Sequence, residues 1–422
     1  MPRKSSRLIW LRYAIVAAFC LGFGTLLAWP AFEAIWTASA DDDFASRQNR
    51  LDQIQWIQTV LIAGFLYTWF FFFGATVGSF LNVVIWRMPR GETVVTRPSR
   101  CPWCSTNLKW NDNIPVLGWL MLGGRCRTCR LPISPRYPIV EAIMGGIFLL
   151  LLQFELLTGG GNLPGVVAVH LNYSRAMLEL QFGLIGLYLF HCFLFCLLLC
   201  WSLIAWDRQR MPLTLALLGF GVGFVGPLIW PALLPVRSGF ESIGNFDDPE
   251  RFSVFLTLLI GMAEGALLGL AMRCFVPSTD ADGSSGRWGV PTMMFAVGLF
   301  FGWQAAATIA AGALLLAIII SPLLKARGRH DMAGGLELSI LTASLIHLLS
   351  WQFWNPFFPP HPLATWGILL GIILFLGLVL RKITWRPSVD LQRFRRTSEV
   401  PGNESPNLQL LASPGTIPEN NR

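Results

Sequence analysis

The sequence predicts an all-α protein that crosses a membrane about ten times and carries a small cytoplasmic domain built on four cysteines. Hydrophobic residues make up 54% of the 422 residues and charged residues only 13%, whereas a soluble chain usually carries about 25% charged residues. The hydrophobic residues occur in runs about 20 residues long, which is enough to cross a hydrocarbon core of roughly 30 Å. A polar, basic stretch with two Cys-x-x-Cys pairs interrupts these runs.

We expect ten membrane spans, and most of these spans each coincide with an apolar run of their own. The run 289–324 is too long for one crossing, and a Gly-Trp-Gln step at 302–304 suits an interfacial turn, so we divide it there. The predicted spans are 8–36, 56–86, 138–157, 180–205, 212–235, 253–276, 289–303, 305–324, 336–354 and 363–380.

The first run follows a basic start, MPRKSSR, so a secretory signal peptide is an alternative interpretation. The apolar stretch of this run is longer than the core of a signal peptide, which favours a retained membrane anchor. Residues 1–55 are therefore expected to form an extra N-terminal anchor followed by an outer loop.

Basic residues indicate the orientation of the chain. With a cytoplasmic N-terminus, the outer loops hold only five of the 32 Lys and Arg residues, namely Arg47, Arg50, Arg175, Arg237 and Arg251. The other 27 then face the cytoplasm, as the positive-inside rule requires. Both termini and residues 87–137 are predicted to be cytoplasmic. This distribution explains the net charge of +8, so we expect no nucleic-acid partner.

The polar stretch has the spacing of a metal site. Cys101 and Cys104 form one Cys-x-x-Cys pair, and Cys126 and Cys129 form the second after 21 intervening residues. Two such pairs at this distance are typical of a tetrahedral, structural four-cysteine zinc site, in which no position is open for a reacting water. Two disulfides are the alternative, which a reducing cytoplasm disfavours.

One acidic residue lies in the middle of a predicted span. Glu264 belongs to the run 253–276, and an intramembrane carboxylate is a candidate functional group. The alternative is a protonated glutamate that is hydrogen-bonded between helices, which its neighbours Gly261, Gly265 and Gly269 would allow to pack closely.

The residues around the cysteine pairs match a known pattern. The stretch GATVGSFLNVVIWRMPRG and the segment from RPSRCPWC to EAIMGG together resemble the N-terminal region of type IV prepilin peptidases over residues 74–146. The matching motifs are residues 78–82, the Cys-Pro-x-Cys pair, and residues 112–115, 124–126 and 136–141.

This resemblance implies an integral protein of the bacterial cytoplasmic (inner) membrane. Members of the family cut the short basic leader from prepilins and pseudopilins on the cytoplasmic side, and many methylate the new N-terminus with S-adenosylmethionine. The expected partners are therefore leader peptides and the lipid bilayer. The expected domains are 56–146 with the zinc knuckle at 87–137, a transmembrane core at 147–380, and a basic, then disordered, tail at 381–422.

The resemblance also implies two catalytic aspartates near the cytoplasmic ends of two membrane helices, and here the chain departs from the pattern. In LIAWDRQRMPLTL, an ungapped match places Ala205 at the first catalytic position and Asp207 two residues later. A gapped match would place Asp207 at the catalytic position, so Asp207 is our one candidate catalytic residue. Val290 stands at the second catalytic position, in a register fixed by residues 302–304.

Two functions are consistent with the sequence. The first is a prepilin leader peptidase whose acid site is altered, so that proteolysis by the usual aspartate pair is not expected. The second is a non-catalytic relative that binds prepilin-like leaders or assembles with a pilus or secretion machine. A zinc module that binds nucleic acid is the weakest alternative, because membrane topology already accounts for the basic loop.

Overall fold

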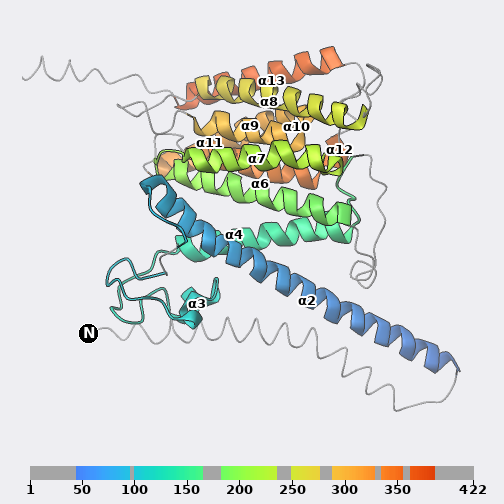
Figure 1. Ribbon diagram of the computed structural model, residues 1–422, viewed down its shortest axis with the longest axis vertical. Coiled ribbons are helices and arrows are strands. Elements are labelled where there is room, and N and C mark those ends of the chain that lie inside the picture. The colour runs from blue at the N-terminus through green and yellow to red at the C-terminus, as the bar shows by residue number, and fades with distance from the viewer. Residues whose placement is uncertain are drawn as a thin grey trace, which may run out of the picture. The chain divides into compact units, whose positions relative to one another are not determined.

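The described part of the chain consists of helices joined by loops (Figure 1). The computed structural model describes residues 44–95, 99–164, 182–234, 249–275, 288–327, 334–354 and 362–384. Within these ranges the only β-type pairings are two isolated bridges in the cysteine-containing loop. The all-α prediction is therefore confirmed for the described residues.

Most of the helices follow the apolar runs of the sequence. They are α2 (Phe44–Arg87), α4 (Arg136–Leu151), its π-helical extension η3 (Leu152–Leu157), α6 (Phe182–Trp206), α7 (Leu213–Ile229), α8 (Pro249–Phe275), α9 (Gly289–Phe301), α10 (Trp303–Ala326), α11 (Gly335–Leu349), α12 (Trp351–Trp354) and α13 (Pro362–Thr384). Short helices are η1 (Met88–Arg90), η2 (Trp110–Asn113), α3 (Leu117–Met121) and η4 (Pro231–Leu233).

Six segments of the described residues are long and apolar enough to cross a membrane, and α7, α9 and α11 are shorter apolar helices. The number of spans predicted from the sequence, ten, is therefore not confirmed. The predicted first span, 8–36, lies outside the described residues.

The predicted break in the run 289–324 is confirmed, because Gly302 separates α9 from α10 with a φ of +82°. Glycine adopts this conformation without steric cost.

Helices α2 and α4 pack through glycine. A Cβ atom at Gly74 would lie 2.8 Å from the Met144 carbonyl oxygen, and one at Gly78 would lie 2.9 Å from Glu141 Cα. Small residues allow membrane helices to approach until their backbones touch, which replaces the hydrophobic driving force that lipid does not supply. Because the cysteine-containing loop connects α2 to α4, this packing sets the two points from which the loop leaves the helices.

Helices α8 and α9 approach each other even more closely. A Cβ atom at Gly261 would lie 2.1 Å from the Gly298 carbonyl oxygen, and a Cβ atom at Gly265 would lie 2.2 Å from the Met294 carbonyl oxygen. The glycines around Glu264 therefore do allow close helix packing, as the sequence predicted. Helix α9 also packs against α6, α7, α10 and α11, so it is a central helix of the described bundle.

The α8–α9 contact gives a first prediction. Gly261→Ala should lower the free energy of unfolding by roughly 1–3 kcal/mol, because the added methyl group meets backbone atoms that cannot move aside. Thermal unfolding of the purified protein in detergent measures the change. Gly221→Ala in α7 is the matched control, because a Cβ atom there meets nothing within 4 Å. Equal stability of the two variants would contradict the backbone contact.

Candidate metal centre and helix-end site

The two Cys-x-x-Cys pairs form the same backbone structure twice. The Cys101 N–H donates to the Thr106 carbonyl oxygen and the Ser105 N–H donates back to Cys101. The second pair repeats this pattern one for one, with Cys126 bonded to the Leu131 and Arg130 backbone groups. Ser105 and Arg130, each directly after the second cysteine of its pair, both have positive φ, at 55° and 60°. Each half therefore closes a tight turn that carries two sulfur atoms.

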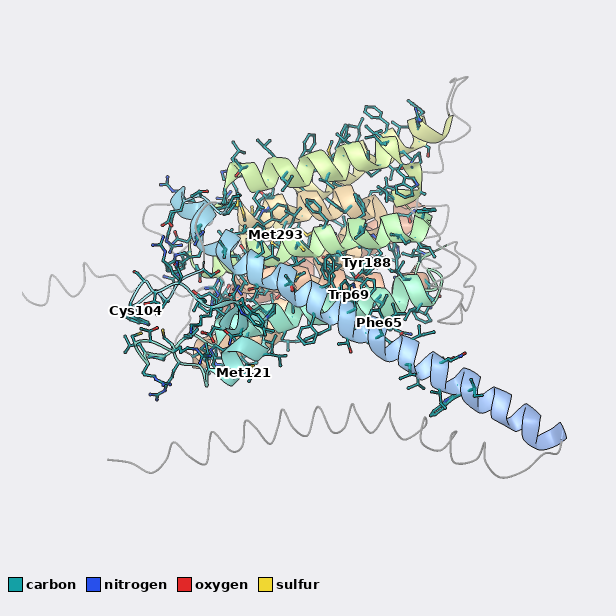
Figure 2. The ribbon with its side chains drawn as sticks, turned by 60° about the horizontal axis from the view of Figure 1, so that its bottom comes forward. Phe65, Trp69, Cys104, Met121, Tyr188 and Met293 are labelled. Carbon is teal, nitrogen blue, oxygen red and sulfur yellow. The ribbon has the colours of Figure 1, made fainter. Side chains whose placement is uncertain are left out.

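These turns bring the four sulfur atoms together. All four lie within 4.8 Å of one another, and the Cys101–Cys129 and Cys104–Cys126 Sγ distances are 3.8 and 3.9 Å. Zinc with four Zn–S bonds of about 2.3 Å would separate adjacent sulfurs by about 3.8 Å. All four cysteines are free thiols, so the disulfide alternative is wrong and the cluster has the geometry of a metal site. Cys104 lies in this loop segment, at one end of the helices (Figure 2).

Hydrogen bonds adjust the charge of the cluster. The Thr106 hydroxyl and backbone lower the pKa of Cys104 to about 6, and the Cys129 and Thr128 backbone groups lower the pKa of Cys126. The Leu131 backbone lowers the pKa of Cys129, but burial and the neighbouring thiols outweigh it and raise that pKa to about 11. The lowered pKa values of Cys104 and Cys126 favour the thiolate form of these two side chains, and the thiolate is the form that binds a metal ion.

The loop between the two turns is fixed by an ion pair. Arg127 donates two hydrogen bonds to Asp112 Oδ1, of 3.1 and 2.6 Å, and one of 3.0 Å to Oδ2. The Arg127 guanidinium lowers the pKa of the Asp112 carboxyl. The Trp119 indole N–H also donates to the Ile133 carbonyl oxygen at 3.0 Å. These contacts tie the intervening loop to the second cysteine turn, so the whole segment 99–133 is one small unit, which we call the knuckle.

One side chain fastens the knuckle to the helices, and a second joins the two helices between which the knuckle lies. The Val116 N–H donates to Glu141 Oε2 of α4 at 2.7 Å. The amide of Asn82, near the end of α2, donates to the Tyr137 carbonyl oxygen at the start of α4. Asn82, Glu141 and the Asp112 motif are residues that carry the family resemblance, and their observed contacts are structural. They form a joint between α2, the knuckle and α4.

The two residues that an ungapped match aligns with the family's catalytic aspartates are buried and apolar in this chain. Ala205 is 8% exposed at the end of α6, and Val290 is 7% exposed at the start of α9. Asp207, two residues after Ala205, accepts a hydrogen bond of 2.6 Å from Arg136. This ion pair is half-buried, with 23% of the Asp207 side chain exposed. Arg136, the first residue of α4, therefore links the knuckle end of α4 to the end of α6, and we count it with Asn82, Val116 and Glu141 as part of the joint.

The structure also places two acidic groups that our sequence reasoning missed. Glu337, in the first turn of α11, is 4% exposed. Glu155 of η3 and His191 of α6 form a fully buried pair with an Oε1–Nδ1 distance of 2.6 Å. Both could have been found from the sequence, because each is an acidic residue inside an apolar segment, but only Glu264 was singled out on this ground. Glu264 Oε1 is buried without a hydrogen-bond partner among the described residues.

The comparisons with known proteins locate the resemblance. Residues 72–154 match the family model described as the bacterial peptidase A24 N-terminal domain. A prepilin leader peptidase/N-methyltransferase of Klebsiella pneumoniae is 34% identical over 189 residues, which are 42% of this chain and 78% of that protein. The protein of the same name from Aeromonas hydrophila is 27% identical over 261 residues, 56% of this chain and 73% of that protein.

Other relatives match over a shorter length. The prepilin leader peptidase/N-methyltransferase of Myxococcus xanthus is 43% identical over 122 residues, and the match spans only 35% of its length. No solved structure matches this chain. Identity and length together, above all for the Klebsiella protein, are sufficient to assign the family. The chain belongs to the prepilin leader peptidase/N-methyltransferase family.

Proposed function

We propose that this chain recognises the leader peptides of prepilins or pseudopilins at the cytoplasmic face of the bacterial inner membrane. The observation that supports this role best is the complete joint of Asn82, Glu141, Val116 and Arg136, which builds the family's N-terminal region and sets it against the end of α6. The relatives that match this region carry the name prepilin leader peptidase.

The proposed function includes slow cleavage. Ala205 and Val290 can neither hold a water molecule nor exchange a proton, and Asp207 is ion-paired with Arg136. Positioned acid–base groups typically contribute a factor of about 100 to 10,000 to such a reaction, so a chain that lacks both aspartates should cleave leaders much more slowly than its relatives. If cleavage is absent altogether, the chain has a non-catalytic role, in which it binds leaders or assembles with a pilus or secretion machine.

Two cofactors belong to the proposal. Zinc would be held by Cys101, Cys104, Cys126 and Cys129, with a structural role, since four protein ligands leave no open position. The relatives' name also contains N-methyltransferase, and methyl transfer would require S-adenosylmethionine. Among the described residues we assign no group to that second cofactor.

The zinc assignment predicts about one zinc ion per purified chain. Cys126→Ser should remove most of it, because three sulfur ligands bind zinc far more weakly than four, and should destabilise the knuckle, whose folding energy comes largely from the metal. Elemental analysis measures the zinc content. Cys274→Ser changes an exposed cysteine outside the cluster and should keep the zinc. A natural chain purified without zinc, under conditions that retain it in a relative, would contradict the assignment.

The proposed topology predicts which residues can be labelled from outside the cell. A cysteine introduced at Arg90 should react with a membrane-impermeant maleimide only after the membrane is opened, and one at Ser242 should react in intact cells. Both measurements use a background without exposed native cysteines. Labelling at position 90 in intact cells would reverse the orientation that the basic residues indicate.

The degenerate aspartate positions predict a gain of activity. Ala205→Asp combined with Val290→Asp restores both carboxyl groups at the ends of α6 and α9, and should speed leader removal from a co-reconstituted prepilin by about 100-fold or more. Ala205→Asn with Val290→Asn is the matched control, because it adds polar groups of the same size without acidity. Cleavage by the natural chain at a rate typical of its relatives would contradict the slow-cleavage proposal.

A further inference from the structure

A buried carboxyl group lies beside the position where the second family aspartate is missing. Glu337 begins on α11, but its side chain reaches α9: a Cβ atom at Gly289 would lie 2.9 Å from Glu337 Oε1. Gly289 directly precedes Val290. The space next to the family's second acid position therefore contains an acid, contributed by a different helix.

The same turn of α11 touches the end of α6. Gly334, which precedes α11, has a φ of +75°, and a Cβ atom there would lie 2.4 Å from Trp206 Cα. Trp206 directly precedes Asp207, and Glu337 is three residues, less than one helical turn, after Gly334. Helices α6, α9 and α11 also pack on one another. Their ends therefore converge, and Asp207 and Glu337 belong to the same group of helix ends.

Helix capping explains only part of this arrangement. Glu337 is three residues after the N-cap residue Gly334, where a glutamate can accept a hydrogen bond from the N-cap backbone N–H, and the Gly334 backbone does hydrogen-bond to Glu337. A glutamine has the same carbonyl oxygen and keeps such a cap. It cannot donate a proton as an acid. Capping does not require the acid, so Glu337→Gln separates the two roles.

We propose that Glu337 supplies the acid that α9 lacks at Val290 and acts with Asp207 in the slow hydrolysis of leader peptides. This inference rests on the proposed function and identifies the groups that carry its chemistry. Burial disfavours an ionised carboxyl group, so Glu337 is the proton donor. Asp207 is partly exposed and paired with Arg136, so it is the carboxylate that accepts a proton.

The step uses one water molecule for each peptide bond. Asp207 takes a proton from water while the water oxygen forms a bond to the scissile carbonyl carbon. Glu337 then gives its proton to the amide nitrogen, and the C–N bond breaks to leave a carboxylic acid and an amine. Proton transfer through solvent from Asp207 to Glu337 restores the starting state. Two carboxyl groups in unlike surroundings are the usual means of keeping one as acid and the other as base.

The test uses the full chain co-reconstituted with a purified type IV prepilin in phospholipid vesicles. Glu337→Gln and Asp207→Asn should each slow leader removal at least tenfold, and leader cross-linking from a photoreactive residue in the prepilin should stay unchanged. Glu264→Gln is the matched control, because Glu264 is a half-buried glutamate on α8, outside these helix ends, and this variant should cleave like the natural chain. Adding Val290→Asp to Glu337→Gln should recover cleavage, which a capping role would not produce.

The outcomes separate this inference from the proposed function. Cleavage by Glu337→Gln at the natural rate would overturn the inference, as would leader cross-linking to the natural chain with no cleavage even after prolonged incubation. In both cases leader recognition would stand. Absence of leader cross-linking to the natural chain would instead overturn the proposed function. A Glu337→Gln variant that loses thermal stability together with activity, without rescue by Val290→Asp, would assign Glu337 to capping and overturn the inference.

Discussion

Backbone contact through glycine is the constraint on which the other features of this structure depend. Lipid tails are as apolar as leucine, so helices in a bilayer gain little by simply burying apolar side chains, and close packing must hold them together. Gly78 brings α2 onto α4, Gly261 brings α8 onto α9, and Gly334 brings α11 onto the end of α6. A methyl group at any of these positions would overlap atoms of the neighbouring helix.

These contacts explain how the helix ends of the proposed site come together. Because α8 holds α9 by backbone contact, the first residues of α9 are fixed next to α11, and Glu337 reaches Gly289. The Gly334 contact fixes the end of α6 at the same place. An acid–base pair needs side chains that are held to within a fraction of an ångström. Direct contacts between helix backbones supply this rigidity.

The knuckle and the helix-end site are physically linked but chemically separate. A four-cysteine cluster has no open position, so it stabilises a fold and exposes a surface. Its connection to the helices is polar: Glu141 holds the Val116 N–H, and Arg136 holds Asp207. Arg136 thus connects the helix to which the knuckle is fastened with Asp207 at the end of α6. Several of the residues that carry the family resemblance, among them Asn82 and Glu141, belong to this connection.

The sequence alone determined the class of the protein and the four cysteines of its candidate metal centre. Composition shows a membrane chain because a hydrocarbon core demands long apolar segments, and cysteine spacing shows a four-ligand site because each pair folds into a local turn. The Gly302 helix break likewise followed from local conformation. All of these are properties of neighbouring residues.

Only the tertiary structure decided which acids meet which partners. Asp207 pairs with Arg136 across 71 residues, Glu155 pairs with His191 on another helix, and Glu337 faces Gly289 from α11. Such pairs depend on how each helix is rotated about its axis and at what height it crosses its neighbour. Nearly every face of these helices is apolar, so hydrophobic periodicity does not reveal the rotation. Backbone packing sets it, and that packing exists only in the folded bundle.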